Sequence, residues 1–300
     1  MKRIAMVAAL ALLAASAFAT GVQEAELGTE ENPLVWSFVP SGDTQEIVAG
    51  GQEVADMIYE RTGLFVEVSV ATEYAGVIEA LASDPPEAHI ASLATFSYIR
   101  AADRGLAQSE LVAVRFGNPF YNGQIIANVE SGITEVEDLG GATFARPDPL
   151  STSGWIIPMI TMRAAGIVPE RDLQQIVDAG GHGGVVAAVY NGDVDAGATY
   201  VDARTTIEED NPDVMEKVRI IETSVPIPND GVQFHPEIPE ELKTQIVEAL
   251  LAIADTEEGR ASLGRAYSWD GLVERGDEFY DPFRQVLQAS GLELDEIEAD

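Results

Sequence analysis

The chain has 300 residues, of which 46% are hydrophobic and 23% are charged. This length and composition are typical of a soluble globular protein of about two compact units, and they exclude a disordered chain. The sequence carries 51 acidic and 17 basic residues, a formal net charge of −34. Nucleic acid and anionic membrane surfaces are therefore poor partners. Cysteine is absent, which excludes disulfides, thiolate metal sites and cysteine nucleophiles.

Residues 1–19 have the features of a cleavable export signal. "MKR" supplies a positive start, "IAMVAALALLAASAFA" is apolar, and Ala17, Phe18 and Ala19 match the A-x-A rule for cleavage before Thr20. The apolar run of about 15 residues is shorter than the roughly 20 that a membrane span needs. We therefore expect removal of residues 1–19. Because no lipobox cysteine is present, we expect a mature protein that is free in the periplasm and not inserted in the membrane.

Strand-like and helix-like segments alternate along the first part of the chain. Branched and aromatic residues predict strands, and apolar residues at helical spacing predict helices between them. The predicted strands cover 34–39, 64–70, 88–93 and 110–116, and the predicted helices cover 44–62, 74–83 and 95–105. This β-α-β rhythm is typical of a parallel sheet.

The same rhythm returns in a second set of segments. Strands are predicted at 142–145, 174–179 and 195–199, with helices at 153–165, 183–191 and near 201–210, and three more helices at about 239–254, 257–267 and 277–289. Two extended segments, 122–130 and 220–230, bracket this set. If both cross between lobes, they form a hinge, and a small ligand sits between the lobes.

These patterns predict an α/β fold of two lobes. Each lobe is expected to be a mostly parallel sheet flanked by helices, and two hinge crossings join the lobes. The first lobe takes residues 30–124 and 226–300, and the second takes residues 125–225.

A hydroxyl cluster lies where the second set's first helix is expected to begin. Residues 148–155 read "DPLSTSGW", which places Ser151, Thr152 and Ser153 together. The first N–H groups of a helix are unpaired and lie at the positive end of its dipole, so they attract an anion. The hydroxyls would add donors at the same point. The alternative is a plain N-cap, worth about 1 kcal/mol.

A glycine-rich corner at 179–186, "AGGHGGVV", adds a second group of donors. Its glycines let backbone amides approach a ligand, and His182 lies among them. These motifs contain no lysine and only Arg146 nearby, so we expect neutral dipoles to hold the anion. Asp202 and Asp230 could then accept only from a protonated oxygen or an ammonium group of the ligand. Their alternative is solvated surface or turn capping.

Enzymatic readings have less support in the sequence. Ser153, His182 and Asp202 occur in the order of a nucleophilic triad, but "STSGW" is not the G-x-S-x-G elbow. The chain has three histidines, no H-E-x-x-H motif and no Walker loop. We therefore expect neither catalysis nor a metal or other cofactor.

Seven segments in this order resemble one family, the phosphate, phosphite and phosphonate-binding proteins of ABC transporters, the PhnD-like group. They are "VPSGD", "ATEYAGVIEAL", "FSYI", "DPLSTSG", "AGGH", "NGDVDAGATYVDA" and "PIPND". The resemblance implies a type II periplasmic binding fold, a monomer that captures a phosphorus oxyanion between its lobes and delivers it to a permease and its ATPase. One departure is "AHIASLAT" at 88–95, where relatives read approximately "VDVAWLGP".

The resemblance also implies a set of site residues. The oxyanion cradle falls on Ser151, Thr152 and Ser153, with His182 as a further donor. Tyr74 and Tyr121 would face the cleft from the first lobe or the hinge. The acidic positions match Asp202 and Asp230, which would accept from a P–OH group or from the amine of an aminophosphonate. Two alternatives to this function stay open: a sensor-input protein of the same fold, and a binding protein for another oxyanion such as a sulfonate.

Overall fold

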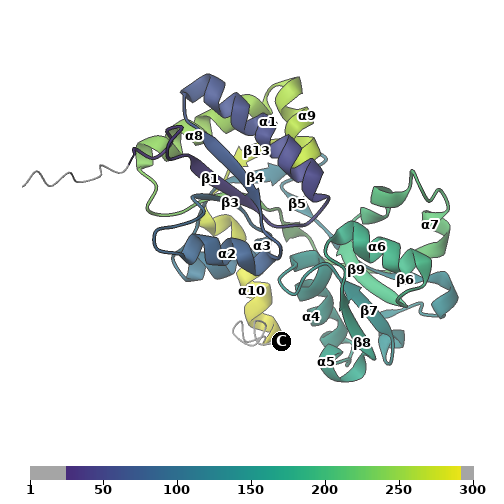
Figure 1. Cartoon of the computed structure of the whole chain (residues 1–300). Helices are drawn as coiled ribbons and strands as arrows, with labels where there is room; N and C mark the ends of the chain where they lie inside the picture. Colours follow the sequence, from purple (N-terminus) through teal and green to yellow (C-terminus); the bar gives the residue numbers. More distant parts are fainter. Residues whose placement is uncertain (1–24, 292–300) are drawn as a thin grey trace, which may run out of the picture.

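Two α/β lobes, joined side by side, make up the protein in a computed structural model that describes residues 25–291 (Figure 1). The predicted export signal, residues 1–19, lies outside the described residues. Among residues 25–291, no helix has both the length and the apolar character required to span a membrane.

The first lobe is built on a six-stranded sheet. In sheet order its strands are β13 (Gly271–Glu274), β4 (Gln108–Val114), β12 (Gly231–Phe234), β3 (Ile90–Ser92), β1 (Leu34–Phe38) and β2 (Val66–Val70). Strand β1 runs parallel to β2 and β3, whereas β12 runs antiparallel to both β3 and β4, and β13 antiparallel to β4. Chain segments from both ends of the sequence therefore share this sheet.

Helices cover both faces of the first sheet (Figure 1). One face carries α1 (Thr44–Thr62), α8 (Glu240–Ala254) and α9 (Glu257–Tyr267), and the other carries α2 (Tyr74–Ala82), α3 (Thr95–Asp103) and α10 (Asp281–Ser290). Helix α1 begins at a carboxylate cap, because Asp43 accepts from the next backbone amides, and ends at Gly63, whose φ is 75°. Gly50 allows α1 to approach α9 closely, since an added Cβ would lie 2.6 Å from the Ser262 carbonyl oxygen.

The second lobe is built on a five-stranded sheet. In sheet order its strands are β10 (Val218–Thr223), β6 (Gly123–Asn128), β9 (Ala196–Tyr200), β7 (Thr143–Arg146) and β8 (Gln175–Asp178). Strand β7 is parallel to β8 and β9, and β6 is antiparallel to β9 and β10. The helices of this lobe are α4 (Ile157–Ala164), α5 (Pro169–Asp172), α6 (His182–Asn191) and α7 (Val214–Lys217).

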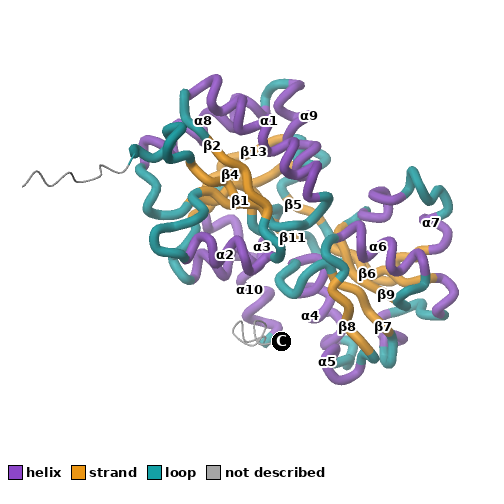
Figure 2. The backbone as a smooth tube through the Cα atoms, viewed as in Figure 1, coloured by secondary structure: helices purple, strands orange, loops and turns teal. Residues whose placement is uncertain are grey.

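Two short strands connect the lobes. Strand β5 (Phe120–Tyr121) pairs antiparallel with β11 (Ile227–Pro228), and both lie between the two large sheets (Figure 2). The two crossings therefore run side by side between the lobes.

The predicted two-lobe α/β class is confirmed, and most strands of each sheet run in one direction, as expected: β1, β2, β3 and β4 in the first sheet and β7, β8, β9 and β10 in the second. The opposite direction is taken by β12 and β13 in the first sheet and by β6 in the second, and both β12 and β6 enter their sheets directly from a crossing between the lobes, without a crossover helix. Strands β12 and β13 were not predicted. The helix expected near 201–210 is a short 3₁₀ turn, Ala203–Ile207. The helix expected from 153 begins instead with a π-turn, Thr152–Ile156, that leads into α4.

Candidate functional site

The hydroxyl cluster lies at the start of the π-turn that precedes α4, at the boundary between the lobes. The Ser151 hydroxyl oxygen caps the turn by accepting from the Gly154 amide at 3.2 Å. Thr152 Oγ1 accepts from the Phe96 amide of the first lobe at 2.9 Å. Ser151, Thr152 and Ser153 are each at most 2% exposed. The cluster is thus a buried element of the interface between the lobes, and the plain N-cap reading describes only Ser151.

Tyr74 reaches this cluster from the first lobe. It begins α2, and its phenol lies close to the Ser151 side chain. Burial raises the pKa of Tyr74 well above its usual value, and the Ser151 hydroxyl opposes this rise only in part. The phenol therefore stays protonated at neutral pH and keeps an O–H to donate.

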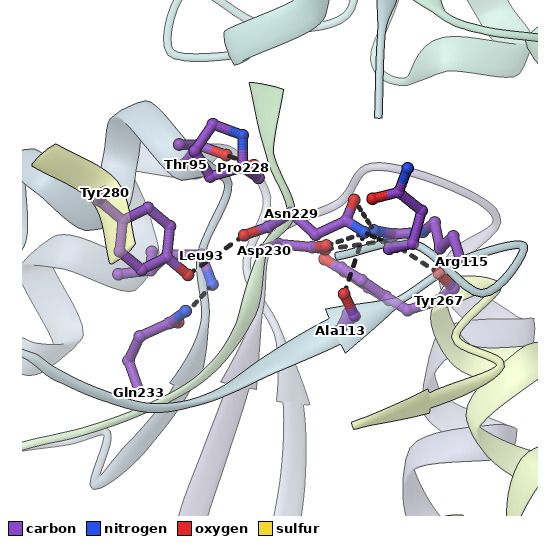
Figure 3. Close-up of polar contacts among 11 residues, drawn as sticks. Leu93, Thr95, Ala113, Arg115, Pro228, Asn229, Asp230, Gln233, Tyr267 and Tyr280 are labelled. Carbon is purple, nitrogen blue, oxygen red and sulfur yellow. Dashed lines mark hydrogen bonds and ion pairs between the residues drawn. The ribbon is translucent and has the colours of Figure 1, made fainter. Parts of the chain in front are cut away.

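Tyr121 reaches the same cluster from the hinge strand β5. Its phenol lies close to the side chains of Ser153 and Thr95, which oppose the rise of its pKa. Thr95 in turn donates to the Pro228 carbonyl oxygen on β11 at 2.6 Å (Figure 3). Burial raises the pKa of Tyr121 to about 12. Two neutral phenols thus lie close to two hydroxyls of the second lobe, those of Ser151 and Ser153.

Further hydrogen bonds hold the lobes in contact around the cluster. The Asp148 carboxylate accepts from the Tyr74 amide at 3.1 Å, and the Ser41 carbonyl oxygen accepts from the His182 amide at 3.2 Å. Asp148 is buried, and this burial raises the pKa of its carboxyl. Asp148 belongs to the "DPLSTSG" motif, yet its role as a link between the lobes was not predicted.

His182 lies at the start of α6. Its Nδ1 is 2.7 Å from Thr199 Oγ1, and its ring packs edge-on against Tyr200 with centroids 4.8 Å apart. Burial, together with the charge of Arg115, lowers the pKa of His182 to about 3. The imidazole is therefore neutral at pH 7. When Nδ1 accepts from the Thr199 hydroxyl, Nε2 carries the hydrogen and is a donor.

The two acids predicted to accept from the ligand both have internal partners. Asp230 is held by the guanidinium of Arg115, with Nη1–Oδ1 at 2.5 Å and Nη2–Oδ2 at 3.1 Å (Figure 3). Asp202 is held by Arg204, with Nε–Oδ1 at 2.9 Å and Nη2–Oδ2 at 2.6 Å. Contact of either acid with a ligand stays a prediction.

Arg115 is the charged group of this region that sequence reasoning missed. It follows β4, and its guanidinium also donates to Asn229 Oδ1 and to the Tyr267 carbonyl oxygen, each at 2.9 Å (Figure 3). The only nearby cation considered from the sequence was Arg146, which pairs with Asp178. A basic residue at the end of "ELVAVRF", where a predicted strand approaches a crossing, was the available signal.

The fold and the site define a class of protein. Two lobes on a two-stranded hinge bring neutral donors from both sides to one buried point, the arrangement of a solute-binding protein that closes around a small ligand. Among residues 25–291, no group of three or more histidine, aspartate or glutamate side chains is arranged to hold a metal ion.

Comparison with known proteins identifies the family. Residues 36–280 match the model of the family described as "ABC transporter, phosphonate, periplasmic substrate-binding protein", and the chain belongs to this family. It is 30% identical to the "Phosphate-import protein PhnD" of Mycolicibacterium smegmatis, over 97% of each chain.

Solved structures agree with this assignment at the level of the fold. A binding protein component of an ABC phosphonate transporter from Pseudomonas aeruginosa superposes with a TM-score of 0.78 at 22% identity, covering 89% of this chain and 90% of that one. PhnD1 from Prochlorococcus marinus, solved in complex with methylphosphonate, superposes with a TM-score of 0.74 at 12% identity, covering 85% and 97%. The chain thus has the type II periplasmic binding protein fold and is the solute-binding component of an ABC transporter.

Proposed function

We propose that the protein captures a phosphorus oxyanion, namely phosphonate, phosphite or phosphate, in the cleft between its lobes and delivers it to a membrane permease with its ATPase. In this proposal Ser151, Thr152 and Ser153 form the oxyanion cradle together with the first amides of the π-turn. His182 donates through Nε2. Tyr74 and Tyr121 close on the anion from the first lobe and the hinge.

One observation carries the proposal. The Tyr74 side chain, from the first lobe, lies close to Ser151, and the Tyr121 side chain, from the hinge, lies close to Ser153. A tetrahedral oxyanion presents several acceptor oxygens, so it matches a group of neutral donors that converge from two sides. One relative is named a phosphate-import protein, and another was solved in complex with methylphosphonate. Both support the same ligand class.

The site favours binding over catalysis. In a nucleophilic triad the acid would orient His182, but His182 Nδ1 lies beside Thr199 and Asp202 is held by Arg204. We propose that the chain is not an enzyme. We also propose that it is exported through cleavage after residue 19 and acts as a monomer.

Titration calorimetry on the purified protein tests the ligand class. Phosphate, phosphite and methylphosphonate are the candidate ligands, and sulfate is the tetrahedral control without phosphorus. We expect at least one phosphorus oxyanion to bind at least about 10-fold more tightly than sulfate, a difference of roughly 1.4 kcal/mol. Ser153→Ala should weaken that binding. Ser131→Ala, which removes a second-lobe hydroxyl that donates to the Asn128 carbonyl oxygen, should not. No binding of any phosphorus oxyanion would contradict the proposal.

A further inference from the structure

We infer that the site selects phosphorus oxyanions without a cationic substituent, because guanidinium groups of the chain itself occupy Asp230 and Asp202, the two acids predicted to receive a ligand ammonium. The inference rests on the proposed function and narrows its ligand class. It favours phosphate, phosphite and simple alkylphosphonates over aminoalkylphosphonates.

Arg115 already occupies the carboxylate of Asp230. Arg115 binds both carboxylate oxygens of Asp230 in a fork, and its remaining contacts go to Asn229 and to the Tyr267 carbonyl oxygen (Figure 3). The Arg115 and Asp230 side chains are only 20% and 13% exposed. A guanidinium held on several sides in this way is a fixed part of the site and does not leave readily for a ligand.

The guanidinium of Arg115 also carries a positive charge beside Asp230. Burial alone would lower the pKa of Arg115, but the charge of Asp230 and the hydrogen bonds to it raise this pKa overall, so the guanidinium stays charged. Its charge reaches His182, where it adds to the lowering of the pKa by burial; at Tyr121 the opposite charge of Asp230 has the larger effect on the pKa. A ligand ammonium at Asp230 would lie beside the like charge of Arg115.

Asp202 is occupied in the same way, by Arg204. Arg204 binds both of its carboxylate oxygens, and Oδ1 also accepts from the Arg204 amide at 3.1 Å and from Gln124 Nε2 at 3.2 Å. Arg204 is fixed further by donating to the Val218 carbonyl oxygen at 2.8 Å. A ligand ammonium would have to displace these donors in order to reach this acid.

A matched pair of ligands separates charge from size. 2-Aminoethylphosphonate and propylphosphonate have chains of the same length and differ by an ammonium in place of a methyl group. We expect 2-aminoethylphosphonate to bind the wild-type protein about 10-fold or more weakly than propylphosphonate, because its ammonium loses water without gaining a free carboxylate. Equal or tighter binding of 2-aminoethylphosphonate would overturn the inference.

Variants test whether Arg115 causes the selection. Arg115→Gln leaves the Asp230 carboxylate free, and the affinity ratio of 2-aminoethylphosphonate to propylphosphonate should rise about 10-fold. The matched control is Arg163→Gln, which removes a guanidinium paired with Glu170 in the second lobe and should leave the ratio unchanged. An unchanged ratio in folded Arg115→Gln would overturn the inference.

Asp230→Asn gives an independent test if Arg115→Gln does not fold. Asparagine has the same shape and keeps an oxygen that accepts from Arg115. If Arg115 already occupies Asp230, the ratio should change by less than about threefold in Asp230→Asn. A selective loss of about 10-fold or more for 2-aminoethylphosphonate would mean that the carboxylate binds the ammonium, and would overturn the inference.

Binding of methylphosphonate and phosphite distinguishes a failure of the proposed function from a failure of the selection against ammonium. If neither of them nor phosphate binds, the proposed function fails. If they bind and 2-aminoethylphosphonate binds as tightly as propylphosphonate or more tightly, the proposed function stands and only the selection against ammonium fails.

Discussion

Replacing Thr152 with alanine removes a hydroxyl that serves both lobe closure and the proposed cradle. Thr152 Oγ1 accepts from the Phe96 amide at 2.9 Å, and both residues are at most 1% exposed. Without this acceptor the amide loses its partner in the closed form, whereas water can solvate it in an open form. An unsatisfied buried amide costs about 1–3 kcal/mol. Because only the closed form holds the ligand from both sides, this cost reduces the apparent affinity.

The same substitution removes a donor to the anion, since the hydroxyl can donate its proton while its oxygen accepts from Phe96. The two losses share one hydroxyl and are not additive, so we expect binding to weaken by about 1–3 kcal/mol, or roughly 5- to 150-fold. The assay is calorimetry with methylphosphonate on wild type, Thr152→Ala and Thr152→Ser, where serine restores the hydroxyl. The matched control is Thr161→Ala on α4, whose hydroxyl donates to the Ile157 carbonyl oxygen at 2.9 Å. Equal affinity in Thr152→Ala and wild type, or an equal loss in Thr152→Ser, would refute the reasoning.

Three further outcomes are expected. Tyr121→Phe removes a neutral donor and should weaken methylphosphonate binding by about 1 kcal/mol in calorimetry; unchanged affinity would remove this phenol from the site. The pKa of His182 is lowered to about 3 by burial and by Arg115, so the unfolded chain binds this proton between about pH 6.5 and pH 3 and the folded protein does not. The free energy of unfolding therefore decreases as the pH is lowered through that window. Between pH 7 and pH 5 the wild type should lose about 2 kcal/mol that His182→Gln does not lose, measured by urea unfolding. Parallel plots of this free energy against pH for the two proteins would contradict the prediction. Gly231→Ala should lower the free energy of unfolding by about 1–3 kcal/mol or more, because its Cβ would lie 1.9 Å from the Leu111 carbonyl oxygen. In Gly42→Ala the Cβ would meet nothing within 4 Å, so a similar loss there would count against the steric explanation.

Local sequence was sufficient for most of the elements. Helices α1, α8 and α9 lie within one residue of their predicted limits, because capping residues and apolar spacing act over a few positions. The sheets were less predictable. Strands β12 and β13 have four residues each, and the antiparallel direction of β12 depends on how the chain returns from the second lobe through β11.

The sequence by itself determined that a run of three hydroxyls begins a helix of the second lobe, and that two crossings connect the lobes. Only the tertiary structure decided what surrounds that run. Asp148 contacts Tyr74 across 74 positions, and Arg115 clamps Asp230 across 115. Such pairs depend on which groups burial and the hinge bring together, and an isolated acid in a sequence rich in acids carries no local sign of its partner. The charge of the cleft is therefore a property of the folded chain, not of any one motif.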